Sequence, residues 1–204
     1  MSITRLTKEE RHAAILTAAG EVFAREGYVR ARVDAIARTA RVGKGTIYEH
    51  FGSKENLLCS YLSHLVHQTV DALTEEAGQD QNPRRALTRL IRGLVESIEP
   101  MIPVMGLFFE AWNLAATRAD MRSRVVDTFR EMYTPVLDLI ADLVRRGRRE
   151  GLFGAHQPKD VASLVVATID GLAYQALFIL DPGDLPRMAR RTEKLLIQGL
   201  DLRP

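Results

Sequence analysis

Residues 29–58 read VRARVDAIARTARVGKGTIYEHFGSKENLL, which holds two short apolar segments separated by a three-residue turn. From 33 to 40, apolar and small residues recur at three- and four-residue steps, the spacing of one buried helix face. Residues 44–50 form the second segment, and the turn lies between them. Two short helices joined in this way, beside a longer apolar-faced helix at 8–26, predict a helix-turn-helix.

The rest of the chain also reads as helix. Ser53 suits the N-cap of a long helix that ends near Gly78. Five more helices are expected at about 84–99, 104–116, 121–149, 161–180 and 186–200. Pro135 either kinks the third of these or breaks it. We therefore predict an all-α protein of about nine helices, with an N-terminal helix-turn-helix domain of three helices at 1–54 and a larger helical domain at 55–204.

The composition excludes several classes of protein. Of the 204 residues, 46% are hydrophobic and 26% are charged, which is too apolar for an intrinsically disordered chain. The single cysteine, Cys59, excludes a disulfide scaffold and suggests a reducing compartment. No run of about 18 uninterrupted apolar residues occurs, and the charged N-terminus lacks the apolar stretch of a signal peptide. We therefore predict a cytoplasmic protein with no membrane-spanning helix.

Charge is distributed unevenly along the chain. Residues 1–54 carry 10 Lys and Arg against 6 Asp and Glu, a balance of +4, whereas residues 55–204 carry 18 against 20, a balance of −2. A basic N-terminal part on a mildly acidic body indicates a polyanionic partner at one end of the molecule. The surplus of positive charge in residues 1–54 is small, so by itself it is weak evidence for such a partner.

The second short helix, 44–50, carries side chains of the types that bind DNA, and we expect them to face solvent. A lysine and a hydroxyl at the start of a helix can reach base edges, and phenol, imidazole and ammonium groups can bond phosphates. We expect base contacts from Lys44 and Thr46, and phosphate contacts from Tyr48, His50 and Lys54. Gly45 lets the backbone approach the groove, and Arg32 and Arg41 add electrostatic reach. The alternative is a purely structural helix pair, in which Tyr48 is half-buried in the core and His50 is an ordinary surface residue.

This stretch resembles the DNA-binding head of the tetracycline-repressor (TetR) family of bacterial regulators. The matching residues form one ordered string over about 8–60. They are Ile15-Leu16, Ala18-Ala19, Val22-Phe23-Ala24, Gly27-Tyr28, Ile36-Ala37, Lys44-Gly45-Thr46-Ile47-Tyr48, His50-Phe51, Ser53-Lys54-Glu55 and Leu57-Leu58. The resemblance implies an all-helical homodimer that binds double-stranded DNA, represses transcription and is released by a small ligand.

Two residues depart from the family's pattern. Arg41 stands where the family usually has glycine. If this position needs a positive φ, arginine there costs roughly 1–2 kcal/mol, so either the turn differs or Arg41 tolerates the strain while it contacts a phosphate. Gly43 stands where the family tends to have a serine or threonine that caps the recognition helix, and glycine caps slightly less well. Neither change removes a protein group that donates a hydrogen bond to DNA. The two departures therefore bear on fine sequence specificity rather than on DNA binding itself.

The body of the chain carries an apolar run at 101–113 with two methionines, two phenylalanines and the only tryptophan. Methionine adapts its shape and aromatic rings stack, so such a lining suits varied flat or apolar ligands. The candidate ligand-binding residues are Met101, Met105, Phe108, Phe109, Trp112, Tyr133 and Tyr174. For a cationic ligand, Glu110 is the first candidate carboxylate. An ordinary helical core explains the run equally well, and the expectation of a pocket depends on the family resemblance.

The last two helices, at about 158–200, are expected to form a homodimer interface. An apolar seam follows the first of them, and small residues such as Gly171 allow close helix crossings. Two such helices from each subunit make a four-helix bundle about a two-fold axis, which implies a pseudo-palindromic operator. The alternative is that the seam packs against the monomer's own core. The arginines within 145–149 are interpreted as a solvated helix end rather than as a second nucleic-acid site.

We therefore predict a DNA-binding transcriptional regulator, most simply a repressor that binds its operator as a dimer and is released by a small, largely apolar or aromatic ligand. The alternative is an architectural or activating DNA-binding dimer without a small-molecule inducer. The sequence contains no Gly-rich phosphate loop, no metal-spaced ligand set and no convincing nucleophile–base pair. We accordingly expect no enzymatic activity, no metal and no cofactor.

Overall fold

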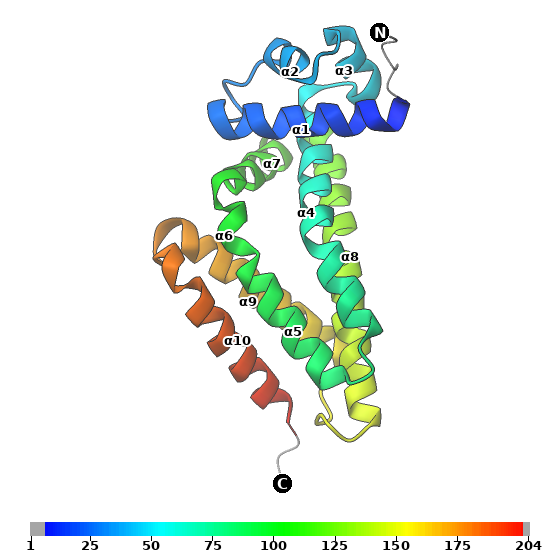
Figure 1. The fold of residues 1–204 in the computed structure, drawn as a ribbon, viewed down its shortest axis with the longest axis vertical. Helices are drawn as coiled ribbons and strands as arrows, with labels where there is room; N and C mark the ends of the chain where they lie inside the picture. Colours follow the sequence, from blue (N-terminus) through cyan, green and yellow to red (C-terminus); the bar gives the residue numbers. More distant parts are fainter. Residues whose placement is uncertain (1–6, 202–204) are drawn as a thin grey trace, which may run out of the picture. The chain divides into compact units, whose positions relative to one another are not determined.

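A computed structural model of the chain describes residues 7–201, so residues 1–6 and 202–204 of the two predicted domains lie outside the described part. Within residues 7–201 the fold is all-α, as predicted, and has no strand (Figure 1). The longer helices are α1 (Lys8–Glu26), α2 (Val33–Ala40), α3 (Lys44–Phe51), α4 (Lys54–Gln79), α5 (Pro83–Glu96), α7 (Gly106–Thr117), α8 (Ala119–Arg149), α9 (Pro158–Phe178) and α10 (Leu185–Leu200). A single-turn helix, α6 (Ile98–Met101), and two 3-10 turns, η1 (Ile102–Val104) and η2 (Pro182–Asp184), join them.

The structure corrects one helix prediction and rejects one of two alternatives for another. The helix expected at 84–99 is divided, since α5 ends at Glu96 and the separate turn α6 follows. Pro135 does not break the predicted helix, because α8 continues through it from Ala119 to Arg149. Pro135 is exposed to solvent, so water can solvate the backbone carbonyl that loses its N–H donor.

The chain forms two compact units. The first comprises Met1–Leu65 with Pro103–Arg130, and the second comprises Val66–Ile102 with Glu131–Pro204. Both long helices, α4 and α8, contribute to the two units, because the division falls inside them. A domain boundary at residue 54 stays a prediction, since the helix that begins there is itself shared.

The first unit is built around α1. Thr7 and Glu10 form a capping box, in which the Thr7 hydroxyl accepts from the Glu10 N–H at 3.1 Å and the Glu10 carboxylate accepts from the Thr7 N–H at 2.8 Å. The helix ends at Gly27, whose φ of 72° lies in the region that glycine adopts without strain. Its buried face packs against α2 (Figure 1). Gly20 permits close approach of Tyr61 on α4, because a Cβ there would lie 2.5 Å from the tyrosine ring.

The core of the second unit is formed by α5, α8, α9 and α10. The fully buried side chains at its centre come from α5 and α8, namely Leu87, Leu90, Ile91, Ile140, Leu143 and Val144. Helices α5 and α10 lie side by side (Figure 1). Two ion pairs connect α5 to α10 and to the residue that follows it, Arg92–Glu193 and Arg84–Asp201. This half of the chain therefore buries a continuous apolar core of its own.

The arginines at the end of α8 bond to nearby backbone groups. Arg146 donates to the carbonyls of Asp80 and Gln81 at 3.0 and 2.9 Å, and Arg148 donates to the carbonyl of His156 at 2.8 Å. These bonds join the helix end to two loops of the second unit. Arg146 and Arg148 of the predicted solvated helix end are thus bonded to backbone groups of the chain.

Helix α9 combines an apolar composition with a largely open surface. By length and hydropathy it is the one helix among residues 7–201 that could cross a membrane, although polar residues interrupt its apolar run. Only 28% of its most apolar stretch is buried within the chain. Large apolar side chains on it and just beyond it remain exposed, namely Leu164, Tyr174, Phe178 and Ile179. Exposed apolar side chains gathered on one helix are typical of an interaction surface.

Candidate nucleic-acid interface

The turn between α2 and α3 is held by a left-handed residue. Arg41 has φ 56° and ψ 40°, and among the described residues it is the one non-glycine residue with a positive φ. The Arg41 N–H donates to the carbonyl of Arg38 at 3.2 Å, and the Val42 N–H donates to the carbonyl of Ala37 at 3.0 Å. The turn thus has the geometry that glycine would adopt without strain, and arginine occupies it at a cost of roughly 1–2 kcal/mol.

Helix α3 has one buried face and one open face. Ile47 and Phe51 are buried against the rest of the first unit, as expected from their spacing. Tyr48 is 44% exposed, which argues against a core role for its ring. A Cβ built on Gly45 meets no atom within 4 Å, so this position also faces open space. The helix therefore presents Gly45 and Tyr48 to a partner outside the chain.

The first turn of α3 has no side-chain cap. Gly43 is its N-cap, with φ −70° and ψ 147°, and no side chain bonds the first amide groups. Unsatisfied N–H groups and the helix dipole make such a helix start favourable for an oxyanion. The Thr46 N–H donates to the Gly43 carbonyl at 3.0 Å, and with glycine at the N-cap no side chain bonds the amide groups of this turn.

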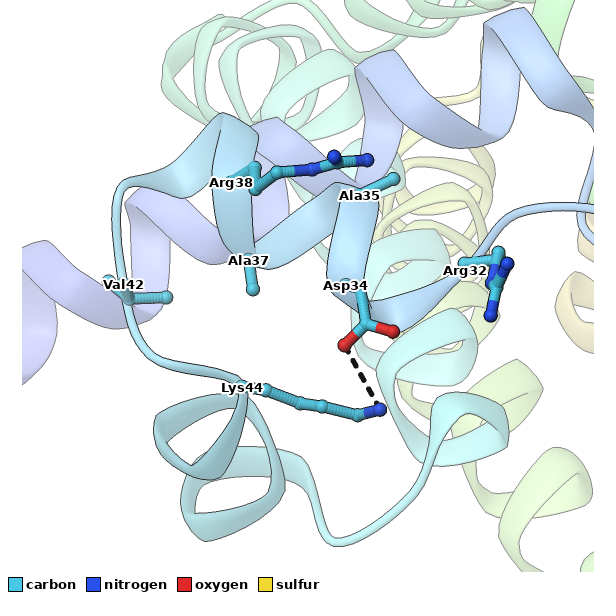
Figure 2. A pocket seen from close by; sticks show the side chains of 7 residues that line it. All are labelled: Arg32, Asp34, Ala35, Ala37, Arg38, Val42 and Lys44. Carbon is cyan, nitrogen blue, oxygen red and sulfur yellow. Dashed lines mark ion pairs between the residues drawn. The ribbon is translucent and has the colours of Figure 1, made fainter.

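Beside this helix start lies an open hollow of about 470 Å³ that is rich in positive charge (Figure 2). Its lining residues are Arg32, Asp34, Ala35, Ala37, Arg38, Val42 and Lys44. The Lys44 ammonium lies 3.0 Å from the Asp34 carboxylate, and both side chains are about half exposed. This hydrogen bond holds the pKa of Asp34 below its ordinary value, and Arg32 and Arg38 add to the effect. Asp34 is therefore ionised at neutral pH.

Two other predicted DNA contacts also have partners within the chain. The Lys54 ammonium donates to the carbonyl of Val29 at 3.3 Å and lies 4.5 Å from the centre of the Tyr28 ring. Burial lowers the pKa of Lys54, and the nearby carboxylate of Glu55 partly opposes that shift. Lys54 thus joins the start of α4 to the loop after α1, and its use as a phosphate contact stays a prediction.

His50 belongs to a small ring cluster. Its imidazole lies 5.8 Å from that of His12 on α1, and the His12 ring stacks on Phe51 at 4.7 Å. Burial lowers the pKa of His12, and the neighbouring charges of His50, His64 and Lys8 lower it further. His12 is therefore neutral at neutral pH and links α1 to the end of α3.

The structure brings six of the eight predicted DNA-binding residues onto α3, the turn before it and the hollow. These are Arg32, Arg41, Lys44, Gly45, Thr46 and Tyr48. His50 and Lys54 lie at the end of α3 and the start of α4. The sequence prediction missed Asp34, which is the acidic residue of the hollow. The available signal was an acid in the first turn of one helix and a lysine at the start of the next, because a tight turn brings such positions together.

The predicted ligand-binding residues fall into two groups. In the first unit, Phe108 and Trp112 both pack edge-on against Phe129, with ring centres 6.4 and 6.5 Å apart. Trp112 is nevertheless 67% exposed, and Phe109 also remains largely open. Met105 is partly buried at the start of α7. The aromatic run at 101–113 is therefore not an ordinary closed core.

The second group lies in the second unit. The Tyr133 hydroxyl on α8 donates to both carboxylate oxygens of Asp170 on α9, at 3.1 Å each. Burial raises the pKa of Asp170, and the hydrogen bond from Tyr133 partly opposes that shift. One helical turn beyond Asp170, Tyr174 is exposed and lies 5.1 Å from the ring of Phe178. Met101 is partly buried in α6. Asp170 is a polar group that the sequence prediction did not include.

Two family models together match most of the chain. The model described as bacterial regulatory proteins, tetR family, matches residues 15–60, which contain the helix-turn-helix. The model of the C-terminal domain of BetI-type transcriptional repressors matches residues 83–197. The two matches coincide with the proposed DNA-binding head and with most of the body.

Individual relatives are similar over long stretches. The transcriptional regulator TtgR of Pseudomonas putida is 27% identical over 209 residues, which covers 98% of this chain and 96% of the relative. The transcriptional activator FasR of Mycolicibacterium smegmatis is 29% identical over 171 residues, covering 83% and 74%.

Solved structures of similar fold include a TetR regulator from Haloarcula marismortui, with a TM-score of 0.80, 18% identity, and coverage of 95% of this chain and all of that chain. A further one is a regulator from Saccharomonospora viridis in complex with choline, with a TM-score of 0.75, 23% identity, and coverage of 96% and 100%. Both agree with the all-α fold described above.

Proposed function

The chain belongs to the TetR family of bacterial regulatory proteins and is a DNA-binding transcriptional regulator, and on that premise we propose that it is a dimeric repressor released by a small ligand. The observation that carries the DNA-binding part is the division of α3 into two faces. Ile47 and Phe51 are buried and anchor the helix to the first unit, while Gly45, Tyr48 and the uncapped first turn face outward. A helix held in this way suits a major groove, where its first residues meet base edges.

The proposed contacts divide by chemistry. Lys44 and Thr46 reach base edges, and Tyr48, His50 and Lys54 bond phosphates. Arg32 and Arg41 are exposed at the two ends of α2 and extend the positive surface toward the DNA backbone. The open space at Gly45 supports a close approach of the helix backbone to the groove.

Affinity measurements on selected DNA test this assignment. Rounds of selection from a random duplex pool supply an operator, and gel shifts then give the Kd of variants. Lys44→Ala and Tyr48→Phe are each expected to weaken operator binding by about 1–3 kcal/mol. Lys159→Ala, which removes an exposed lysine at the start of α9, is the matched control and is expected to leave the Kd unchanged. A folded Lys44→Ala, Tyr48→Phe double variant with wild-type affinity contradicts the assignment.

We propose that the effector is a cation with apolar substituents, bound in the second unit. Asp170 has the Tyr133 hydroxyl as its partner, and no cation pairs with it among the described residues. Tyr174 lies one helical turn away on the same face of α9. A carboxylate beside exposed aromatic rings suits a quaternary ammonium or similar group. The choline held by the structural relative from Saccharomonospora viridis belongs to this chemical class.

Choline and its neutral isostere 3,3-dimethylbutan-1-ol test the charge requirement. Choline is expected to release the operator at lower concentration than the alcohol, and Asp170→Asn is expected to abolish that difference. Equal potency of the two compounds on the wild-type protein contradicts a cationic effector. The predicted contacts Met105, Phe108, Phe109 and Trp112 of the first unit are probed in parallel by the change in Trp112 fluorescence.

We also propose that α9 and α10, at about 158–200, form the homodimer interface. The exposed Leu164, Phe178 and Ile179 of the α9 region and Leu195 of α10 supply an apolar surface, and Leu195 is 70% exposed. A two-fold dimer of this kind requires a pseudo-palindromic operator. Light scattering on Leu164→Glu is expected to give a monomer with weakened operator binding, and an unchanged dimer mass contradicts this interface.

Ligand and operator are proposed to act through two states of the dimer. One state spaces the recognition helices for adjacent major grooves, and the ligand binds the other state more tightly. Reciprocity then requires that operator DNA weaken ligand binding by the same factor. The second candidate function is an activator, which the similarity to the activator FasR favours. Reporter expression with and without the protein separates the two, because a repressor lowers expression and an activator raises it.

A further inference from the structure

We infer that Asp34 is a specificity-determining residue, which together with Lys44 reads one G·C base pair in each half of the operator and holds Lys44 neutralised on other DNA. The inference rests on the proposed function, because it requires the start of α3 to enter a major groove. It assigns a role to an acidic side chain on a surface that is otherwise adapted to a polyanion.

The geometry of the pair places both groups within reach of DNA. Asp34 stands in the first turn of α2, and Lys44 is the first residue of α3. Their charged atoms are 3.0 Å apart, with 52% of the Lys44 side chain and 50% of the Asp34 side chain exposed. In Figure 2 a dashed line joins the Asp34 carboxylate to the Lys44 ammonium, and Arg38 also lines the hollow. The pair is thus a surface feature of the DNA-facing side.

A carboxylate at this position opposes binding to unselected DNA. DNA phosphates repel the Asp34 carboxylate. The Lys44 ammonium, because Asp34 neutralises it, releases fewer counterions from DNA than an unpaired lysine does. Asp34 is also the one acid among the seven residues that line the hollow, so it lowers the positive charge there. An exposed ion pair contributes little to folding stability, which leaves the two groups free to exchange partners. The pair therefore weakens binding wherever DNA offers the carboxylate no donor.

A G·C pair satisfies both groups most fully. In the major groove, guanine presents two adjacent acceptors, O6 and N7, and its cytosine presents the N4 amino donor beside them. Lysine only donates and a carboxylate only accepts, so a side-by-side Lys–Asp pair matches acceptors on one side and a donor on the other. An A·T pair also offers a donor, N6, beside an acceptor, but N6 lies between N7 and O4, so whichever acceptor Lys44 takes, the other stays against the carboxylate. The pair therefore favours G·C, with Lys44 on guanine and Asp34 on cytosine.

Selection from a random duplex pool, carried out with matched variants, tests the inference. Asp34→Ala and Lys44→Ala are both expected to lose the preference for G·C at the same base pair of each half-site, by roughly 5- to 150-fold. Asp34→Ala is also expected to bind random duplex more tightly, with a salt slope steeper by about 0.9 per half-site because Lys44 is released for a phosphate. Asp34→Asn keeps the side-chain shape and is expected to steepen the slope equally.

The control variant is Asp127→Ala. Asp127 forms a comparable exposed pair with Arg130 on α8, at 3.3 Å, so its removal changes the net charge equally without touching the hollow. It is expected to keep the wild-type sequence preference and salt slope. If Asp34→Ala keeps the wild-type preference at every position, or weakens binding to all sequences equally, Asp34 does not read a base. Failure of the wild-type protein to select any duplex overturns the proposed function instead, so the two outcomes are distinguishable.

Discussion

Replacing Arg41 by glycine should stabilise the fold while weakening DNA binding. Arg41 has φ 56° in the turn before α3, a region that costs a residue with a Cβ about 1–2 kcal/mol. Glycine removes that cost but adds about 0.4–1 kcal/mol through the greater freedom of the unfolded chain. With the middle of each range, the expected net gain is about 0.8 kcal/mol, or about 2–3 °C in Tm for a chain of this length.

The same substitution removes an exposed guanidinium from the proposed DNA-facing surface. If Arg41 meets a phosphate, the slope of log K against log salt becomes shallower by about 0.9 per half-site. Urea unfolding and calorimetry measure the first effect, and gel shifts over a salt series measure the second. The expected combination is therefore a more stable protein that binds its operator more weakly.

Arg41→Ala is the matched control, since alanine keeps the left-handed strain and loses only the guanidinium. Its stability should stay near that of the wild-type protein, and its operator affinity should fall as in Arg41→Gly. Equal stability of the glycine and alanine variants would refute the strain argument. Wild-type affinity in both variants would refute the DNA contact while leaving the strain argument intact.

Three further outcomes follow from packing and protonation. Gly20→Ala should destabilise the fold by about 1–3 kcal/mol in urea unfolding, because its Cβ would lie 2.5 Å from the buried Tyr61 ring; an unchanged midpoint contradicts this. Gly147→Ala should likewise destabilise, since its Cβ would lie 2.1 Å from the buried ring of Phe153; a gain in stability from helix propensity contradicts it. The pKa of His12 is lowered in the folded protein, so on acidification the unfolded chain binds a proton at this residue at a higher pH than the folded one. The free energy of unfolding should therefore fall as the pH drops below about 6.5. His12→Gln should flatten this dependence of the unfolding free energy on pH, and an unchanged dependence excludes His12 as its source.

The helix-turn-helix was predictable because its determinants are local. The spacing of Ile36 and Ala37 on one helix and of Ile47 and Phe51 on the next defines the buried faces, and all four side chains are buried. The glycine that the family usually has at this position left two alternatives open, a different turn or a strained arginine, and the structure shows Arg41 with φ 56°. Short-range periodicity and turn geometry therefore carry most of the information about this part of the fold.

The side-chain pairs of the site could not be predicted in the same way. The sequence places an acid and a lysine on either side of a tight turn, but whether Asp34 and Lys44 pair depends on the angle between two helices and on the rotamer of a long lysine. The same holds for Lys54, whose ammonium contacts the Val29 carbonyl 25 residues earlier. Hydropathy likewise could not distinguish a closed core from an open surface at Trp112, because both favour a large aromatic side chain. These features depend on tertiary packing.

The exposed apolar surface of α9 is better explained by a second protein chain than by a bilayer. The helix Pro158–Phe178 has the length and hydropathy of a membrane span, yet the carboxyl group of Asp170 stands well inside it. A carboxylate at the centre of a bilayer costs about 2.5–3.5 kcal/mol, and its hydrogen bond to Tyr133 ties this face to α8 instead. A two-fold partner can cover Leu164 and Phe178 while leaving Asp170 accessible to a ligand, because an interface between helices need occupy only part of each helix surface. The proposed dimer and the proposed effector site are therefore compatible on one helix, whereas insertion of the whole helix in lipid would bury the charge that the effector requires.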